Sequence, residues 1–177
     1  MSDDDKPRTP LRPAAAAVPG WEGIVLRAPR EVSWARALVS PPPYNPSGKK
    51  FARMVVVGYA MSRPSIRRGA ESDWAFSTYP SPMLVLRDGA TGELIKRASV
   101  DRIHAEYRAI VDGMSISYAQ PQPPTPSIPD DNGRRDGGPF EVDIGFYLTE
   151  PTAPRELRVH AELGPLRSNE VTIRLVP

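Results

Sequence analysis

The chain has 177 residues, including 22 prolines, 13 glycines and no cysteine, and its formal net charge is +2. The absence of cysteine excludes a disulfide scaffold and a thiolate-based zinc site, and the lack of a Gly-X-Y period excludes collagen. No apolar run reaches the roughly 18–20 residues that a membrane-spanning helix needs, and the length fits one domain, or one domain with an arm.

Residues 1–20 predict an extended, proline-rich arm. Pro7, Pro10, Pro13 and Pro19 prevent a helix, and few side chains in this stretch are available for burial. The first six residues include three aspartates and lack the basic and apolar regions of a secretory signal. We therefore expect a cytoplasmic protein, and export by a route other than Sec stays open.

The charged residues are unevenly distributed along the chain. Residues 21–68 hold nine Lys or Arg against two Glu, a net of +7, whereas residues 69–177 hold eleven Lys or Arg against sixteen acids, a net of −5. If these blocks fold into separate faces, the faces favour head-to-tail contact with a second copy of the chain. The alternative is that both signs interleave after folding, which is the more ordinary outcome.

From residue 21 onward the sequence predicts short strands separated by turns. Stretches at 24–26, 32–39 and 51–61 indicate three strands, the second from its alternation and the third from its consecutive β-branched valines. The segment 62–80 is predicted to be a loop. Residues 83–97 predict a β-hairpin, because Asp-Gly and Thr-Gly turn residues separate two apolar arms.

Residues 99–113 fit two patterns, because their apolar side chains recur at helical spacing and also at alternate positions. We favour a short helix, with Asp101 as its N-cap and Gly113 as its stop. Alternation over 114–118 then predicts a strand. The segment 119–139 holds six prolines and predicts a long loop.

The last third of the chain has the clearest alternation. Residues 140–148, 157–163 and 171–175 predict three strands, each apolar on one face and polar on the other. His160 is expected on the polar, exposed face. Three consecutive strands with one buried face indicate an antiparallel sheet packed against another apolar layer.

Two stretches resemble known families of sandwich domains. Residues 155–176, RELRVHAELGPLRSNEVTIRLV, resemble the last hairpin of bacterial immunoglobulin-like and fibronectin-type-III-like domains, where a Ser-Asn-x-Val-Thr-like element (here Ser168–Thr172) opens the final strand. Residues 88–100, DGATGELIKRASV, resemble the Asp-x-x-Thr-Gly hairpin of transthyretin-like and carboxypeptidase-regulatory-like sandwiches. Both resemblances imply a sandwich, and neither implies a catalytic residue.

We therefore expect an all-β fold of two parts. Residues 1–20 form the extended proline-rich arm. Residues 21–177 form an antiparallel immunoglobulin-like β-sandwich of about eight strands and one short helix, with long loops at 62–80 and 119–139.

The sequence contains no recognisable catalytic or metal-binding pattern. His104 and His160 stand apart and lack acids at metal-ligand spacing, and no nucleophile-elbow, phosphate-loop or dinucleotide-binding motif is present. The Asp- and Gly-rich stretch 130–138 departs from the order of acids in a calcium loop and includes Arg134 and Arg135, so a flexible polar loop is preferred. We expect no cofactor and no enzyme activity. A pocket with a converging acid and base would revive the enzyme reading.

Basic and aromatic residues mix in the predicted 62–80 loop. Arg67 and Arg68 precede Trp74 and Tyr79, a combination found on surfaces that bind polyanions or carbohydrates. The nearly balanced charge and the lack of a recognition motif argue against a nucleic acid as the partner.

These observations favour a non-catalytic structural or protein-interaction module, whose partner is another protein or a second copy of the chain. One form of this hypothesis is a subunit of a homo-assembly that uses its N-terminal arm. The alternative is a polyanion- or carbohydrate-binding module that uses the 62–80 loop.

Overall fold

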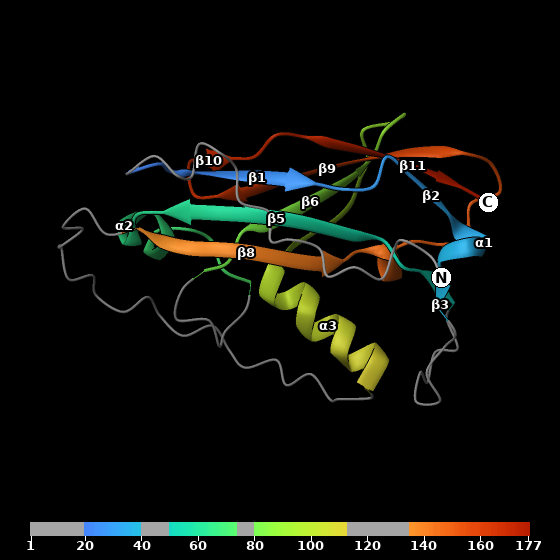
Figure 1. Cartoon of the computed structure of the whole chain (residues 1–177), viewed down its shortest axis with the longest axis horizontal. Helices are drawn as coiled ribbons and strands as arrows, with labels where there is room; N and C mark the ends of the chain where they lie inside the picture. The colour runs from blue at the N-terminus through green and yellow to red at the C-terminus, as the bar shows by residue number, and fades with distance from the viewer. Residues whose placement is uncertain (1–19, 40–49, 74–79, 113–134) are drawn as a thin grey trace, which may run out of the picture.

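The computed structural model describes residues 20–39, 50–73, 80–112 and 135–177 (Figure 1). Within these ranges the chain is mostly β, with two main sheets, one two-stranded sheet and few helices. The predicted arm (except Gly20), the predicted strand at 114–118 and the aromatic residues Trp74 and Tyr79 lie outside the described residues.

The smaller main sheet, sheet A, has three antiparallel strands in the order β1-β5-β8. Their bounds are Gly23–Arg27 for β1, Val55–Ser62 for β5 and Asp136–Asp143 for β8. Strand β5 occupies the centre and is buried along most of its length, as its β-branched valines lead one to expect.

The larger sheet, sheet B, has the order β2-β11-β9-β6-β7, and β10 also pairs with β9. All pairs are antiparallel except β2 with β11, which is parallel. The bounds are Glu31–Ser33 (β2), Met83–Asp88 (β6), Leu94–Ser99 (β7), Arg155–Leu163 (β9), Leu166–Arg167 (β10) and Val171–Val176 (β11). The chain thus leaves sheet A after β1 and enters sheet B at β2.

The remaining elements lie around these sheets (Figure 1). They are the pair β3 (Leu38–Val39) and β4 (Phe51–Ala52), the helices α1 (Trp34–Ala37), α2 (Pro64–Arg68) and α3 (Val100–Asp112), and the 3-10 turn η3 (Gly145–Tyr147). Helix α3 contacts both β8 and β7. It therefore lies across the two sheets at one side of the core.

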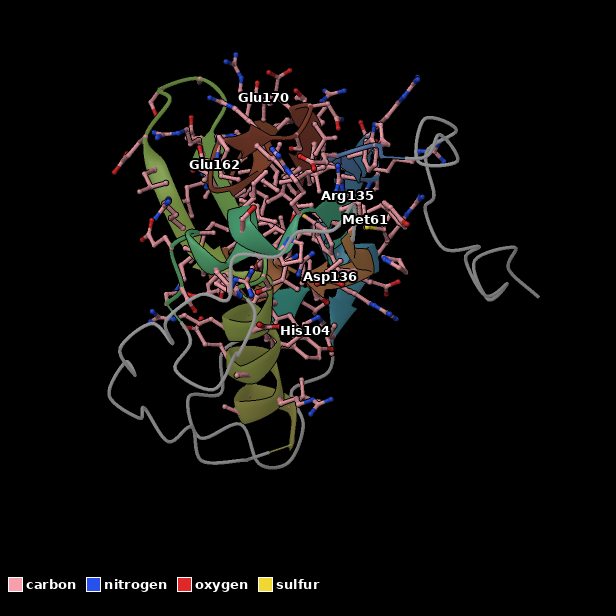
Figure 2. The ribbon with its side chains drawn as sticks, turned by 90° about the vertical axis from the view of Figure 1, so that its left-hand side faces the viewer. Met61, His104, Arg135, Asp136, Glu162 and Glu170 are labelled. Atoms are coloured by element: carbon pink, nitrogen blue, oxygen red, sulfur yellow. The ribbon has the colours of Figure 1, made fainter. Side chains whose placement is uncertain are left out.

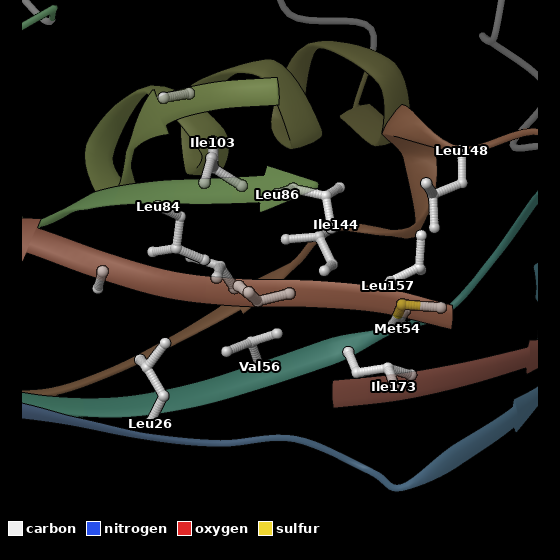
Figure 3. Packing of buried hydrophobic residues seen from close by; sticks show 14 of the residues in the cluster. Leu26, Met54, Val56, Leu84, Leu86, Ile103, Ile144, Leu148, Leu157 and Ile173 are labelled. Carbon is white, nitrogen blue, oxygen red and sulfur yellow. The ribbon is translucent and has the colours of Figure 1, made fainter. Parts of the chain in front are cut away.

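One hydrophobic core is shared by sheet A, sheet B and α3. Figure 3 shows Leu26 of β1 and Val56 of β5 on one side, with Leu84 of β6 and Leu157 of β9 on the other and Ile103 of α3 above. All five side chains are buried. Burial of one such side chain contributes about 1.5–3 kcal/mol relative to its exposed state, so the core accounts for the packing of the layers.

Several sequence predictions are confirmed at the level of single elements. The strand at 24–26, the hairpin at 83–97 and the strands at 157–163 and 171–175 correspond to β1, β6 with β7, β9 and β11. The helical alternative for 99–113 is also correct, since α3 covers Val100–Asp112. The predicted strand at 51–61 is present but divided into β4 and β5.

The prediction of one strand over 32–39 is wrong. Strand β2 ends at Ser33, which pairs with Val176 near the end of β11, so the next residues have no strand beside them. The chain instead turns through α1, where Trp34 becomes buried at 2% exposure. Alternation along the sequence cannot indicate where the partner strand ends.

Three further boundaries differ from prediction. The predicted loop at 62–80 contains α2, and the predicted loop at 119–139 overlaps the first residues of β8. The predicted strand at 140–148 stops at Asp143, because its partner β5 begins at Val55, opposite Asp143. Beyond that point the apolar residues reach the core through η3 rather than through a strand.

The prediction that His160 is exposed is also wrong. Its exposure is 4%, and its Nε2 atom lies 3.0 Å from Oε1 of Glu162. Val85, which is opposite His160 in the β6–β9 register, is buried at 2%. This part of the outward face of sheet B is therefore covered by protein, which a two-residue period by itself cannot reveal.

A side chain joins the outer edge of β1 to the start of β11. Asn169 Oδ1 accepts a hydrogen bond from the N–H of Leu26 at 2.9 Å, and Asn169 Nδ2 donates one to the carbonyl of Leu26 at 3.1 Å. The amide acts as a strand neighbour for β1, whose other edge pairs with β5. Sheets A and B are therefore linked by two hydrogen bonds between residues 143 positions apart.

The preceding serine has a similar role inside sheet B. The N–H of Ser168 donates to the carbonyl of Ala161 at 2.9 Å, and Ser168 Oγ accepts from the N–H of Ala161 at 2.8 Å. The same hydroxyl donates to the carbonyl of Asn169 at 2.6 Å. These bonds hold Asn169 in position to reach β1.

Replacing Asn169 tests this link. Asn169→Ala leaves both polar backbone groups of Leu26 without their partner, so we expect a loss of about 1–3 kcal/mol in the free energy of unfolding, measured by urea denaturation. Thr172→Ala, at an exposed position in β11, is the control and is expected to change stability by less than about 0.5 kcal/mol. Equal stability of the two variants would show that the link contributes nothing.

Candidate functional site

A cavity of about 150 Å³ lies between α3 and the adjoining ends of β5 and β8. It is open to solvent on one side. Its lining combines charged, polar and apolar side chains from three elements and the residue before β5: Arg53, Val55, Ile103, His104, Tyr107, Glu141 and Asp143. Figure 2 shows His104 on α3, below the strand β8 that supplies the two carboxylates.

Asp143 fixes the geometry at the base of this cavity. Its Oδ1 atom accepts hydrogen bonds from the N–H of Met54 at 3.0 Å and from the N–H of Gly145 at 2.9 Å. Its Oδ2 atom is buried and has no hydrogen-bond partner among the described residues. Burial raises the pKa of Asp143, although the two N–H donors and nearby Arg53 act in the opposite direction.

The local sequence explains why Asp143 ends β8. Gly145 approaches β4 so closely that a Cβ atom there would lie 1.6 Å from the carbonyl oxygen of Ala52. Only glycine permits this approach, and the Asp143 side chain bonds to the N–H of the same glycine. The Asp-Ile-Gly sequence therefore forms a tight turn that holds β8 against the start of β5.

Aromatic contacts hold the α3 side of the cavity. The ring of Tyr107 lies 6.2 Å from that of Phe51 in an edge-to-face arrangement and 6.0 Å from that of Phe146. Such pairs add about 0.5–1.5 kcal/mol to the gain from burial. These contacts fix the ring of Tyr107, on α3, against β4 and η3.

A polar network around Glu106, the residue before Tyr107, also fixes α3. The Glu106 carboxylate accepts hydrogen bonds from Tyr147 Oη, from Arg102 Nε at 2.7 Å and from Lys96 Nζ. Burial acts to raise the pKa of Glu106, but these donors outweigh it and lower the pKa. Glu106 is therefore ionised and links α3 to β7 and η3. The groups that donate hydrogen bonds to it all belong to the fold itself.

His104 lies at the mouth of the cavity, with part of its ring exposed. Protein packed against the rest of the ring lowers its pKa, because desolvation disfavours the charged imidazolium. Asp101 and Glu141 oppose this effect, while Arg108 adds to it. The imidazole is therefore neutral at pH 7.

The cavity brings together groups that the sequence does not link. A carboxyl group with a raised pKa and an imidazole with a lowered pKa line the same small volume. No hydrogen bond joins His104 to Asp143 and neither group shifts the pKa of the other, so the two do not converge as a catalytic acid and base do. In the sequence His104 stands out as one of two histidines, whereas Asp143 occupies one polar position of a longer predicted strand and no pattern marks Arg53, Tyr107 or Glu141. The Asp-x-Gly spacing was the available signal, since it is typical of a turn closed by the Asp side chain.

The two predicted site residues within the described chain, Arg67 and Arg68, lie elsewhere, in α2. Arg67 Nε donates to Oγ of the buried Ser62 at 3.2 Å. Burial lowers the pKa of Arg67, and the opposing attraction of Asp136 and Asp101 does not fully offset it. Trp74 and Tyr79 lie outside the described residues, so the predicted grouping of arginines and aromatics stays a prediction.

Further arginines surround α2. Arg63 Nε and Arg135 Nε lie 2.9 Å and 2.7 Å from the same oxygen of Glu22. With Arg67 and Arg68 they form a group of four that we call the arginine corner, where β5 ends and β8 begins; Figure 2 labels Arg135 and Asp136 there.

The guanidinium of Arg67 lies against the backbone of β8. A Cβ atom at Gly137 would lie 2.9 Å from Arg67 Nη2 and 1.9 Å from the carbonyl oxygen of Ala60. Gly137 also has a φ of +150°, which disfavours other residues. The position of Arg67 therefore depends on this glycine.

The chain matches no family model, no curated protein and no solved structure in the comparisons with known proteins. Across residues 20–39, 50–73, 80–112 and 135–177, no three His, Asp or Glu side chains gather closely enough to hold a metal ion. None of the helices in these ranges has the length and apolar character needed to cross a membrane.

Two substitutions of Asp143 separate its hydrogen bonds from its charge. Asp143→Ala leaves the buried N–H groups of Met54 and Gly145 without an acceptor, so we expect a loss of about 2–4 kcal/mol in unfolding free energy. Asp143→Asn keeps an acceptor and removes the buried charge, so it is expected to be clearly more stable than the alanine variant.

The pH profile of the asparagine variant gives a second readout. Because the pKa of Asp143 is higher in the folded than in the unfolded state, the wild-type chain loses stability as pH rises from about 4 through the raised value. The asparagine variant lacks this loss, so its stability relative to wild type should increase over that interval and then level off. Parallel profiles in urea unfolding would contradict the assignment.

Proposed function

We propose that the chain is a non-catalytic protein-interaction module built on an immunoglobulin-like β-sandwich, and that its partner is a second copy of itself. The observation that carries the proposal is the uneven charge along the chain, with a net of +7 over residues 21–68 and −5 over residues 69–177. The strand order supports the fold, and residues 1–20 supply the arm in the assembly that we propose.

The strand order supports an immunoglobulin-like arrangement. Such domains place strands A, B and E in one sheet and strands G, F and C in the other, with an added strand beside C in the variable type. The order β1-β5-β8 corresponds to A-B-E, and β11-β9-β6-β7 corresponds to G-F-C with the added strand. The parallel strand β2 extends the second sheet beside G.

The charge distribution along the chain supports contact between unlike regions of two copies. Strands β1 and β5 and helix α2 all come from residues 21–68, whose net charge is +7. Strands β6, β7, β9, β10 and β11 all come from residues 69–177, whose net charge is −5. The strands themselves do not carry this split. The strands of sheet A hold one arginine against three acids, whereas those of sheet B hold seven Lys or Arg against four acids, so the basic and acidic regions lie in the helices and connections outside the strands.

A contact between a basic region of one copy and an acidic region of the next is heterologous, since two different surfaces meet. Electrostatic complementarity of this kind raises the rate of encounter and weakens as salt screens it. Assembly of this chain should therefore depend on ionic strength, and a proline-rich arm is suited to span neighbouring copies.

The test is the molar mass in solution of the full chain and of a chain that lacks residues 1–20, by size-exclusion chromatography with light scattering. We expect the full chain to assemble at low salt and to dissociate at high salt, because screening weakens contacts between charged faces. Removal of the arm should shift the equilibrium toward the monomer.

The opposite result has a clear form. If both chains are monomers at every protein and salt concentration, the assembly is excluded. If both assemble equally and irrespective of salt, neither the arm nor charge complementarity drives association.

A second candidate function is polyanion binding at the arginine corner. The observation that favours it is the state of Arg67, whose Nε is held by Ser62 while its two terminal nitrogens have no hydrogen-bond partner among the described residues. A guanidinium held in this way offers a planar pair of N–H donors that suits sulfate or phosphate groups. Carbohydrate binding would depend on Trp74 and Tyr79, which lie outside the described residues.

Heparin affinity tests this second function. The double variant Arg67→Ala/Arg68→Ala should bind heparin more weakly, and the slope of log affinity against log salt should fall by about two. The control is Arg158→Ala/Arg174→Ala, which removes the same charge from exposed positions on sheet B. Equal losses in the two double variants would indicate a general charge effect and would exclude a site at the arginine corner.

A further inference from the structure

The cavity between α3 and β8 is flanked by two opposite charges that do not pair with each other. Arg53 and Glu141 both line it and are both exposed. Among the described residues neither side chain takes part in an ion pair within 4.0 Å or in a hydrogen bond. Exposed arginines and glutamates elsewhere on the chain do pair, as Arg174 and Glu31 do.

The arrangement of the strands separates these charges. Glu141 and Asp143 are two residues apart on β8 and lie on the same face, so their backbones are about 7 Å apart. The hydrogen bond from the N–H of Met54 to Asp143 brings the neighbouring Arg53 to the Asp143 end. The cavity therefore has the Glu141 carboxylate at one end and, near the other, the Arg53 guanidinium beside the carboxyl group of Asp143.

We propose that this cavity binds a small zwitterion of the α-amino-acid class, with its ammonium group toward Glu141 and its carboxylate toward Arg53. A ligand with only a positive charge would meet Arg53, and a ligand with only a negative charge would leave Glu141 without a partner. A molecule that carries both charges a few bonds apart matches both ends. Charge-assisted hydrogen bonds to carboxylate and guanidinium groups are the strongest that such a ligand can form.

The remaining lining sets the size of the ligand. Val55 and Ile103 are buried apolar residues, and the ring of Tyr107 is fixed by Phe51 and Phe146. A volume of about 150 Å³ equals that of an engineered cavity that holds benzene. The cavity thus accommodates an amino acid with a small apolar side chain, such as alanine.

His104 adds a polar group without a second positive charge. Because its imidazole is neutral at pH 7, it can donate or accept a hydrogen bond at the mouth of the cavity. Glu141 interacts with it electrostatically, so the ligand's ammonium group would lie near both.

The test is a titration of the full chain with L-alanine, followed by amide chemical shifts in NMR. Ethylamine and propionate, each with one of the two charges, are titrated in parallel. We expect alanine to shift the amides of Met54, Glu141 and Gly145 in a saturable manner at millimolar concentration. Each singly charged compound should bind at least about tenfold more weakly, because one charged contact is missing.

Variants assign the two ends of the site. Arg53→Gln and Glu141→Gln are exposed substitutions that should leave thermal unfolding unchanged and weaken alanine binding about tenfold each. Arg53→Lys should restore part of the loss. Arg158→Gln and Glu170→Gln, an exposed pair on sheet B, are the matched controls and should bind alanine like wild type.

Three results would overturn the proposal. One is the absence of saturable shifts with alanine. Another is equal binding of ethylamine and alanine together with no loss in Arg53→Gln, which would define a site for cations alone. The third is an unchanged affinity in both glutamine variants, which would place alanine elsewhere on the chain. None of these results bears on the oligomeric state, so this inference and the proposed assembly fail independently.

Discussion

The link between Asn169 and Leu26 fixes how the two sheets meet at the point where the chain passes from one to the other. Strand β1 belongs to sheet A, but the chain leaves that sheet within a few residues and enters sheet B as β2, beside β11. The side-chain amide of Asn169, just before β11, forms hydrogen bonds with both the N–H and the carbonyl of Leu26 in β1. These two bonds join the strands where the chain passes between the sheets. Because unpaired backbone groups at such an edge are costly, the amide lets β1 and β11 lie in different sheets and remain adjacent.

A second set of hydrogen bonds between distant segments lies on the other side of the core, at Asp143. There one carboxylate holds the start of β5, the end of β8 and the turn into η3. Burial raises the pKa of this carboxyl group, so its charged form lowers the stability of the fold. Its hydrogen bonds to Met54 and Gly145 act in the opposite direction. Helix α3 packs over Asp143 and is held there by the contacts of Tyr107 and by the hydrogen bonds to Glu106. The cavity is the space between the Asp143 carboxyl group at the end of β8 and helix α3, which lies over it.

The candidate sites occupy separate parts of the molecule. The arginine corner lies where β5 ends and β8 begins, whereas the cavity lies at the opposite ends of the same two strands. Arg63, Arg67 and Arg68 of the arginine corner also belong to the basic segment 21–68, so the proposed assembly and polyanion binding share these side chains.

Local patterns in the sequence determined much of the character of this protein, namely antiparallel strands and the hairpin at 83–97, whereas residues 100–112 fitted both a helix and a strand until the structure showed α3 there. These follow from side-chain periodicity and turn residues, which act over a few positions. Only the tertiary structure decided where β2 and β8 stop, because a strand ends where its partner ends, and the partner lies far away in the sequence. The same reason explains why His160 is buried and why Arg53, His104 and Glu141 meet at one cavity. Their proximity is set by pairing between distant strands and by the packing of α3, and no spacing along the chain encodes it.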